Sequence, residues 1–405
     1  MRSVAWLLAV STLATCAPGD EGPAPPVDTA EPLPPARVRA ASLSSAAAEH
    51  APGEAMRFHF IDIGQGDATL LEFPCGAVLI DTGGESNDQF DGQRALLAYL
   101  EGFFASRPDL DGTLDLMILT HPHIDHVRAA MAVLERYQVK NVIDNGTERT
   151  GEIGGDDQIA VHAWLKEHPE VGYLHARARD IDRARGTTSP LIDPIGACER
   201  SRVDPKLTLL WGEVEDDLKS YGDDPNNHSV VTRVEFGESS ALFTGDLEFI
   251  GLSRMFSAFA GHEEVFDVDI YQVGHHGSKN ATTHYLMEAM SPTLAVISAG
   301  PYERDVDWTA RRYGHPNIAA LRHLVHASYG VKGFREHPAE VMIGIKGAWK
   351  DERKEQFERR SIYRAVYATS WDGTVVVTAG SDGRMRVVTE RHPPLPGAIA
   401  QARAP

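Results

Sequence analysis

The hydrophobic positions of this chain fall in short runs that are followed by glycine, aspartate or histidine. Residues 58–73 and 77–84 carry strand-like apolar runs, and residues 114–119 predict a short buried strand. The spacing of apolar residues over 127–137 predicts an amphipathic helix. Residues 120–126 are therefore expected to form a turn from a buried strand into a helix.

That turn places three imidazoles and one carboxylate within six residues. In its extended part His121 and His123 are two positions apart and point the same way, while Asp125 and His126 follow at the turn and can face a second ion. Imidazole nitrogen and carboxylate oxygen suit zinc, manganese or iron, and the lack of thiolates argues against a closed structural zinc site. The pattern predicts ligands for two divalent metal ions, expected to be Zn or Mn.

Length and charge limit the classes of function. A chain of 405 residues can bury a large core, and its formal charge of −19 keeps it soluble and repels polyanions on average. Any contact with nucleic acid must therefore come from a local basic patch or from the metals. In the less patterned stretch 146–202, which also predicts a helix over 157–167, four arginines form either such a basic lip or an ordinary solvated loop: Arg177, Arg179, Arg183 and Arg185.

The N-terminus has the pattern of a targeting segment. A charged start and a short apolar run lead to Leu-Ala-Thr-Cys16, which resembles a bacterial lipobox and predicts a lipoprotein-type signal peptide over 1–16 that ends at an acylated Cys16. An ordinary signal peptide or an uncleaved anchor is the alternative, because Thr is unusual before the cysteine. Residues 17–53, rich in Pro and Ala, predict a flexible tether. We expect an extracytoplasmic bacterial membrane lipoprotein without a transmembrane helix in the mature chain, or else a secreted soluble protein.

Acylation of Cys16 would leave Cys75 and Cys198 as the remaining cysteines. They either form a disulfide in an oxidising compartment or stay two separate buried thiols. The spacing of the two residues does not choose between these states.

Further polar motifs follow strand-like segments along the chain. In order, they are Asp-Ile-Gly-Gln-Gly-Asp (62–67), Asp-Thr-Gly-Gly (81–84), the histidine-rich turn (120–126), Asn-Asn-His-Ser (226–229), Thr-Gly-Asp-Leu-Glu (244–248) and Gly-His-His-Gly-Ser (274–278). This order resembles the metallo-β-lactamase fold, and as a set the motifs closely resemble the extracellular hydrolase domain of the ComEC competence family, which acts in DNA internalisation. The resemblance covers residues 56–385.

The resemblance implies an α/β fold, a four-layer αββα sandwich with a single catalytic domain over 56–385 and a disordered tail over 386–405. It also implies how the metal ligands divide between two ions. One ion is held by His121 and His123, the other by Asp125 and His126, with Asp246 bridging the two and His275 completing the second site. The residues expected to take part in catalysis are Asp125, Asp246 and His276.

Two positions of this ligand set stay open. Adjacent side chains on an extended segment face opposite ways, so one of His275 and His276 binds metal, with His275 favoured, and the other reaches the substrate or orients a ligand. His228 stands where many hydrolases of this fold have a histidine ligand. It is either a possible further metal ligand or an ordinary loop residue.

Four more residues are placed by the motifs close to the same rim: Asp81, Gln65, Asn227 and Ser278. By resemblance Asp81 orients the ligands, with the capping of a strand end as its alternative role. The other three are expected to donate hydrogen bonds to substrate oxygens, and each has a plain structural alternative in a turn, cap or loop. Further along, residues 362–377 predict a hairpin around Asp372 and Gly373.

The expected activity is that of a secreted, membrane-tethered phosphodiesterase or nuclease, with DNA as a possible substrate, in which two metal ions share a hydroxide that attacks the phosphodiester. A lactonase or amide hydrolase on the same fold is the first alternative, because fold and metals do not determine the substrate. A non-enzymatic surface protein that binds nucleic acid or a partner is the second, and the complete ligand set argues against it. The oligomeric state is unknown.

Overall fold

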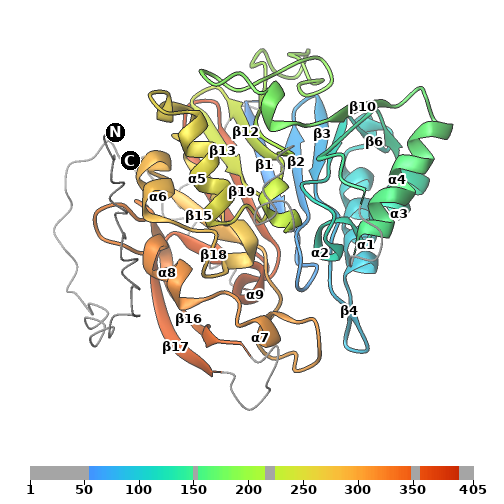
Figure 1. The fold of residues 1–405 in the computed structure, drawn as a ribbon. Coiled ribbons are helices and arrows are strands. Elements are labelled where there is room, and N and C mark those ends of the chain that lie inside the picture. Colours follow the sequence, from blue (N-terminus) through green and yellow to red (C-terminus); the bar gives the residue numbers. More distant parts are fainter. Residues whose placement is uncertain (1–53, 149–153, 215–223, 348–355, 392–405) are drawn as a thin grey trace, which may run out of the picture. The chain divides into compact units, whose positions relative to one another are not determined.

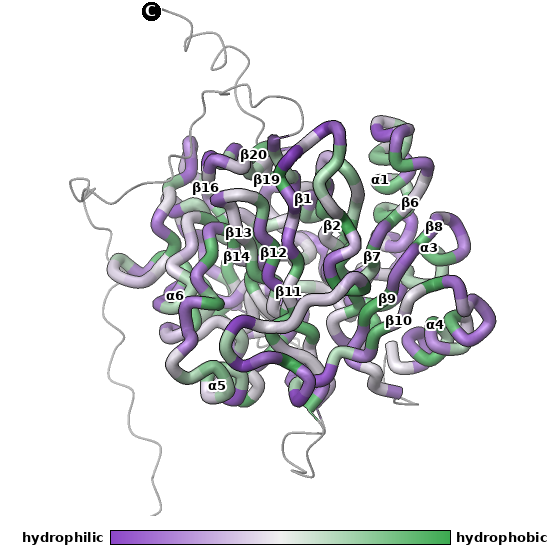
Figure 2. Tube along the Cα trace, turned by 90° about the horizontal axis from the view of Figure 1, so that it is seen from above, coloured by the Kyte–Doolittle hydropathy of each residue, from purple (hydrophilic) through white to green (hydrophobic). Residues whose placement is uncertain are grey.

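Two β-sheets pack face to face in this protein and helices cover their outer faces, as the computed structural model shows (Figures 1 and 2). The structure describes residues 54–148, 154–214, 224–347 and 356–391. The four-layer αββα arrangement expected from the sequence is confirmed. The predicted signal peptide, Cys16 and the tether lie outside the described residues.

The larger sheet has eight strands and contains the first strands of the fold. Its spatial order is β10 (Gly172–His175), β9 (Asn141–Asp144), β7 (Leu116–Ile118), β3 (Gly76–Ile80), β2 (Thr69–Phe73), β1 (Ala55–Phe60), β19 (Val375–Gly380) and β20 (Met385–Thr389). The second sheet has six strands, in the order β11 (Lys206–Trp211), β12 (Val231–Phe236), β13 (Ser239–Phe243), β14 (Ile270–Gln272), β15 (Leu294–Ile297) and β18 (Val366–Ala368).

Three short two-stranded pairings stand beside these sheets. They are β4 (Ser86–Asn87) with β5 (Phe90–Asp91), β6 (Thr113–Leu114) with β8 (Gln138–Val139), and the longer ribbon β16 (Phe334–Lys346) with β17 (Gln356–Arg364).

Helices lie outside both sheets, as the view from above makes clear (Figure 2). Beside the eight-stranded sheet are α1 (Gly92–Ser106), α3 (Ala130–Arg136) and α4 (Gly155–Glu167), and beside the six-stranded sheet are α5 (Phe249–Ala258), α6 (His284–Met290) and α8 (Ile318–Leu324). The remaining helical turns are α2 (Ile124–Val127), α7 (Ala310–Tyr313), α9 (Thr369–Asp372), η1 (Pro108–Leu110), η2 (Ala178–Asp180), η3 (Pro225–His228), η4 (Glu263–Phe266) and η5 (Gly274–Gly277). None of the helices in the described ranges is both long and apolar enough to cross a membrane.

Alternate side chains of the eight-stranded sheet pack into two separate hydrophobic cores, one on each face of the sheet. Leu71 and Val78 belong to the core between the two sheets, whereas their neighbours Leu70 and Leu79 pack under α1, α3 and α4. Successive side chains of a strand point to opposite faces, so a strand covered on both sides becomes apolar throughout. This explains why β2 and β3 appear in the sequence as continuous apolar runs.

The polar motifs of the sequence gather at one edge of these sheets. Strands β3 and β7 are parallel neighbours in one sheet, and β13 and β14 are parallel neighbours in the other. Parallel strands end at the same edge, where ligands of open α/β sheets bind. Asp81, His121, Asp246 and His276 each follow the carboxyl end of one of these strands.

Three expectations about local structure need correction or refinement. The predicted hairpin over 362–377 is wrong, because β18 pairs with β15 in one sheet and β19 pairs with β1 in the other. The chain crosses between the sheets through α9, where the Asp372 carboxylate accepts the Ala368 N–H at 3.1 Å. The boundary at residue 385 is also wrong, because β20 continues pairing with β19 up to Thr389. The helix expected over 127–137 is divided into α2 and α3, whereas that over 157–167 is confirmed within α4.

The structure decides the state of the two remaining cysteines. Cys75 and Cys198 form a disulfide that links the β2–β3 turn to the loop before β11, across 123 residues of sequence. Closing so long a loop removes much of the conformational freedom of the unfolded chain. The disulfide therefore ties the long segment between β10 and β11 to the larger sheet.

Candidate metal centre

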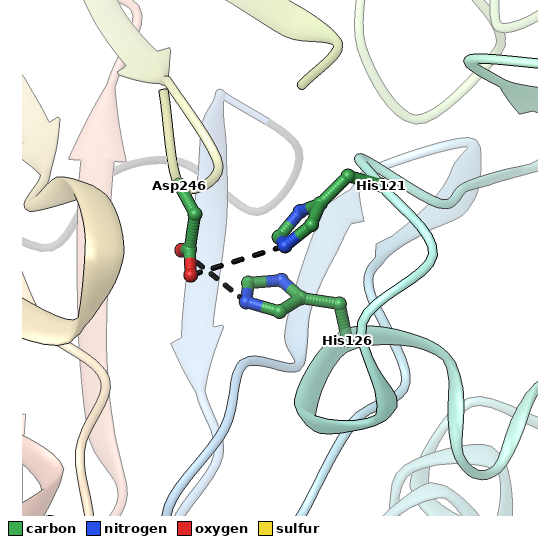
Figure 3. A group of neighbouring side chains, drawn as sticks. All are labelled: His121, His126 and Asp246. Carbon is green, nitrogen blue, oxygen red and sulfur yellow. Dashed lines mark ion pairs between the residues drawn. The ribbon is translucent and has the colours of Figure 1, made fainter. Parts of the chain in front are cut away.

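Two buried histidines of the turn after β7 meet the aspartate that follows β13 (Figure 3). His126 Nε2 lies 3.2 Å from Asp246 Oδ1, and His121 Nε2 lies 3.9 Å from Asp246 Oδ2. The side chains of both histidines are 0% exposed and that of Asp246 is 4% exposed. The two sheets thus bring together, in a dry environment, groups that stand 120 and more residues apart in the sequence.

A second group of possible ligands shares His126 with the first. It consists of Asp125, His126 and His276. His276 Nε2 lies 3.2 Å from His126 Nε2, 3.3 Å from Asp125 Oδ2 and 3.5 Å from Asp246 Oδ2. His276 Nε2 therefore lies within 3.5 Å of one possible ligand atom from each of the other three residues.

Each of the three buried imidazoles has its Nδ1 occupied by a protein acceptor. His126 Nδ1 donates to Asp81 Oδ2 at 2.7 Å, and His276 Nδ1 donates to the Ser298 carbonyl at 2.9 Å. Thr120 Oγ1 donates to Asp81 Oδ2 at 2.8 Å and lies 3.1 Å from His121 Nδ1, from which it can accept. Nε2 of every ring is then directed into the cluster and becomes a metal-binding atom once its proton is displaced, which is the arrangement found around metal-binding histidines.

Asp125 is positioned by unusually close backbone packing. Its carbonyl oxygen accepts the Asp67 N–H at 2.9 Å. A Cβ atom added at Gly83 would lie 1.5 Å from this oxygen, and one added at Gly66 would lie 2.6 Å from it. Glycine is needed at both positions because any side chain would push the Asp125 segment, and with it the carboxylate, out of place.

The spacing of the ligand atoms suits a metal ion. In a tetrahedral site with bonds of about 2.0–2.1 Å, neighbouring ligand atoms lie about 3.3–3.4 Å apart. The separations around His276 Nε2 are 3.2, 3.3 and 3.5 Å. The nitrogen and oxygen donors, the fixed tautomers and this spacing all fit a divalent cation such as zinc, as is usual in this fold.

The preference for His275 over His276 changes on this geometry. The two residues do not lie on an extended segment, because η5 places both in the left-handed region, with φ 51° and 53°. His276 points into the cluster, while His275 lies on its rim, with Nε2 3.7 Å from Asp246 Oδ2 and Nδ1 3.4 Å from Glu248 Oε1. The tight turn, rather than strand alternation, decides which ring faces the ligands, and it favours His276.

Of the other two histidines expected near the metals, His123 lies beside the cluster and His228 lies outside both groups of possible ligands. His123 Nδ1 lies 3.1 Å from His121 Nε2, close enough for the two nitrogens to share an ion. His228 Nδ1 accepts the Val214 N–H at 3.1 Å, and its carbonyl accepts from Asn145. Within the described ranges His228 belongs to neither group of possible ligands.

The residues predicted to donate hydrogen bonds to substrate oxygens instead make bonds within the protein. Gln65 Oε1 accepts the Gly300 N–H at 3.5 Å, and Asn227 Oδ1 accepts the Gly251 N–H of α5 at 3.0 Å. Ser278 is buried, and its backbone N–H donates to the His275 carbonyl at 2.7 Å. The side-chain bonds of Gln65 and Asn227 support their structural alternatives, whereas the bond of Ser278 is made by its backbone. Asp81 differs, because its bonds to Thr120 and His126 agree with an orienting role.

The charges of the cluster depend on one another. Burial alone would raise the pKa of Asp246, but the charges of His126 and His276 hold it well below its usual range. Conversely, burial would lower the pKa of His276, but Asp246 and Asp125 raise it to about 9. The cluster therefore keeps its carboxylates ionised and attracts positive charge from either protons or a cation.

Several residues at the centre did not stand out in the sequence. Burial and the charge of Asp81 raise the pKa of Asp67 to about 7, and its carboxylate accepts a hydrogen bond from Gln272 of the other sheet. Ser298 and His315 also contact His276, the latter with ring centroids 6.2 Å apart. Asp67 belongs to the motif 62–67, whereas Gln272, Ser298 and His315 lie outside the motifs recognised in the sequence.

The four arginines of the loop 177–185 contact acidic or aromatic side chains of the protein. Arg185 pairs with Asp182, Arg179 lies beside Asp180, and the Arg183 guanidinium lies 5.3 Å from the Trp211 ring. Arg177 Nε lies 3.9 Å from Glu213 Oε2. These contacts favour the solvated loop over a basic lip.

Comparison with known proteins agrees with this geometry. The model of the metallo-beta-lactamase superfamily matches residues 61–300. The chain is 29% identical over 285 residues to ComE operon protein 3 of Bacillus subtilis, covering 67% of this chain and 31% of that protein. It is 25% identical over 268 residues to Recombination protein 2 of Haemophilus influenzae, covering 65% of this chain and 26% of that protein.

A third relative is the uncharacterized protein YcaI of Escherichia coli, 33% identical over 252 residues, which cover 61% of this chain and 25% of that protein. The chain thus spans less than a third of the length of these curated relatives. The resemblance to the ComEC family expected from the motifs is confirmed.

Proposed function

This chain belongs to the metallo-β-lactamase superfamily, and from that premise we propose that it is a phosphodiesterase that depends on two divalent metal ions. One ion would be held by His121, His123 and Asp246. The second would be held by Asp125, His126 and His276, with Asp246 shared between the two. Relatives named for competence and recombination make nucleic acid the first substrate to test.

The observation that carries this proposal is the set of buried imidazoles with Nδ1 fixed by Asp81, Thr120 and Ser298. A histidine with a purely structural role can also make such bonds. A metal ligand requires them, because they hold Nε2 in one direction.

The residues around the cluster have separate tasks in the reaction. When bound, the two cations would neutralise the oxygens of a phosphodiester and lower the pKa of a water molecule towards neutrality. Asp81 holds the proton on His126 Nδ1, and the Ser298 carbonyl holds the proton on His276 Nδ1. Gly66 and Gly83 keep Asp125 in place, and His275 stands on the rim where it can contact the substrate.

We also propose that the protein is extracytoplasmic and tethered through an acylated Cys16. The lipobox-like sequence supports the anchor. The disulfide between Cys75 and Cys198 supports an oxidising compartment. Detergent-phase partitioning tests the anchor, and unchanged processing and membrane association of Cys16→Ala would refute it.

Metal content and a substrate panel test the activity. The purified protein should carry close to two divalent ions and should hydrolyse bis(p-nitrophenyl) phosphate or single-stranded DNA in a manner that chelators abolish. The panel should include duplex DNA, RNA, a lactone and a β-lactam. A metal-loaded protein that is inert on every phosphodiester but hydrolyses the lactone would replace the proposal by the second activity.

A further inference from the structure

One histidine beside the cluster is buried without the hydrogen bonds that buried polar groups usually make. His315 follows α7 and is 8% exposed, and its Nδ1 atom has no hydrogen-bond partner among the described residues. A buried polar atom without a partner costs about 1–3 kcal/mol, so such atoms are rare in folded proteins. The unused Nδ1 atom of His315 therefore has the capacity to bond a ligand.

Two other histidines with the same degree of burial satisfy both ring nitrogens within the protein. His59 is 8% exposed, and its nitrogens lie 2.7 Å from the Tyr99 hydroxyl and 3.3 Å from the Glu72 carboxylate. His162 is 7% exposed and lies between two carboxylates, at 2.7 and 3.0 Å. Burial by itself therefore does not deprive a histidine of partners in this protein, and His315 differs from both.

The His315 ring lies directly against the candidate metal centre. Its centroid is 5.9 Å from that of His275 and 6.2 Å from that of His276. The Tyr313 ring stacks on it, with centroids 5.5 Å apart. Within the described ranges His315 belongs to neither group of possible metal ligands. The unpartnered nitrogen thus belongs to a ring that contacts the metal ligands without being one of them.

The backbone after His315 is fixed to the turn that carries His276. The Asn317 N–H donates to the Gly277 carbonyl at 2.8 Å. A Cβ atom added at Gly277 would lie 3.0 Å from the Pro316 Cβ, so the two segments are closely packed. The fold therefore holds the His315 ring in place before any substrate arrives, which lowers the entropy cost of binding.

The cluster is accessible to solvent at Asp125 and His275. The side chains of His121 and Asp246 are 0% and 4% exposed, whereas those of Asp125 and His275 are 27% and 19% exposed. A substrate therefore reaches the cluster past these two residues. Because the His315 ring contacts His275, it borders this route.

We propose that His315 donates a hydrogen bond from Nδ1 to a phosphate oxygen of the substrate and is thus a substrate-binding residue of this site. This inference rests on the proposed function. The phosphate of a phosphodiester offers only acceptors and carries a negative charge, so an imidazole N–H forms a strong hydrogen bond with it.

The additional donor also bears on the class of substrate. A phosphodiester has two oxygens that are not esterified, so one can face the metal ions while the other accepts from His315. A lactone has a single carbonyl oxygen for both tasks. A site built to bond a particular group discriminates against substrates that lack it, and the contact therefore favours a phosphodiester over the lactone.

Three substitutions separate the hydrogen bond from the ring. His315→Asn places an amide N–H close to the position of Nδ1, His315→Gln places one close to Nε2, and His315→Phe keeps a ring without a donor. On bis(p-nitrophenyl) phosphate, KM should rise about 10- to 100-fold in His315→Phe and His315→Gln, the range of a hydrogen bond to a charged group, with kcat little changed. His315→Asn should stay close to wild type, and all three variants should keep their metal.

The matched control is His59→Phe, the same substitution at a histidine of equal exposure that bonds Tyr99 of α1. It should leave KM unchanged. A rise of KM in both phenylalanine variants would overturn the proposal, as would loss of metal from His315→Phe. An unchanged KM in His315→Phe would show that Nδ1 bonds no more than a water molecule. Rescue by His315→Gln in place of His315→Asn would overturn the assignment to Nδ1.

A binding measurement without turnover distinguishes failure of this inference from failure of the proposed function. Calorimetric titration of inorganic phosphate into the metal-loaded proteins gives a Kd for wild type and each variant. We expect phosphate to bind about 10- to 100-fold more weakly to His315→Phe and His315→Gln, and with nearly wild-type affinity to His315→Asn. This result would support the contact even if no phosphodiester were hydrolysed. Equal affinities, or no binding to wild type, would overturn it even in an active phosphodiesterase.

Discussion

Two sets of buried charges in this protein are balanced in different ways. Near the crossing between the sheets, Arg335 and Asp372 form a double ion pair with contacts of 2.5 and 3.1 Å, and their side chains are 4% and 0% exposed. The Arg335 guanidinium also donates to the Val366 carbonyl, and the Asp372 carboxylate also accepts from the Ala368 N–H. This pair is neutral and complete within the protein.

The cluster at the sheet edges is built in the opposite way. Two buried carboxylates, Asp81 and Asp246, and the half-buried Asp125 stand among imidazoles whose Nε2 atoms point at one another. Among the described residues, the ion-pair partners of Asp125 and Asp246 are all histidines, and none is an arginine or lysine. A buried set that needs an added cation has the composition of a binding site, whereas a set that neutralises itself has that of a structural support.

The largest expected effect is the loss of activity on removing Asp246. Asp246→Ala should reduce kcat/KM at least about a thousandfold, because several kcal/mol of charge stabilisation by the metals would be lost. Metal content, measured by elemental analysis, should fall while circular dichroism stays native. A folded variant with wild-type metal content and rate would contradict the assignment. Asp382→Ala, an exposed carboxylate beside Arg384, serves as the control.

Disruption of the Arg335–Asp372 pair should lower the stability of the protein, whereas loss of Asp246 should lower activity and metal content. Asp372→Ala leaves an unpaired buried guanidinium and should lower the free energy of unfolding by about 3–5 kcal/mol. Replacing both partners, as in Arg335→Met with Asp372→Leu, should recover most of that loss because no charge stays unpaired. Urea unfolding measures both. If the double variant is no more stable than the single one, the pair is not a self-contained unit.

A third charged group allows a test by pH. Burial would raise the pKa of Glu72, but the hydrogen bond with His59 and the charge of Arg57 lower it to about 2. A folded-state pKa below the usual 4.5 contributes stability that is complete above pH 4.5 and is lost as the pH falls towards 2. This contribution amounts to up to about 3 kcal/mol.

The comparison uses wild type and Glu72→Gln, both treated with chelator and unfolded in urea. The difference in free energy of unfolding should be largest near pH 7 and should shrink between pH 4.5 and 2. A difference that does not depend on pH would show that the carboxylate charge has no part in it.

The smallest effect is expected for the residue that orients a ligand. Asp81→Asn loses one of the two oxygens that accept from Thr120 and His126, so metal affinity and activity should fall about 10- to 100-fold. Asp115→Asn is the matched control, since Asp115 is a buried carboxylate that accepts a backbone N–H from Ala77, away from the cluster. Equal losses in both variants would mean that Asp81 acts only on the fold.

Much of the candidate site could be predicted because its residues belong to short motifs. The turn 120–126 carries its ligands within a few positions, so spacing alone indicated a metal site. The resemblance carried by the motif 244–248 implied the role of Asp246, and the structure places this residue 3.2 Å from His126. Local sequence was sufficient wherever the chemistry lies on one turn or one strand end.

The predictions that failed or changed depend on contacts between distant segments. The choice between His275 and His276 follows from a left-handed turn held between β14 and α6, which strand alternation does not describe. The segment 362–377 looked like a hairpin because its turn residues suit one, but pairing with β15 and β1 draws its two strands into different sheets. Local propensity was overridden there by the larger area that the two sheets bury.

By itself, the sequence determined where the ligand-bearing turns begin, because apolar periodicity and short motifs are local properties, and the αββα fold followed from the resemblance that the motifs carry. Only the tertiary structure decided that Cys75 joins Cys198, and that Gln65 and Asn227 bond within the protein. Each of these depends on which distant segments meet. The free energy of that meeting comes from burying both sheets together, a quantity that no single stretch of sequence contains.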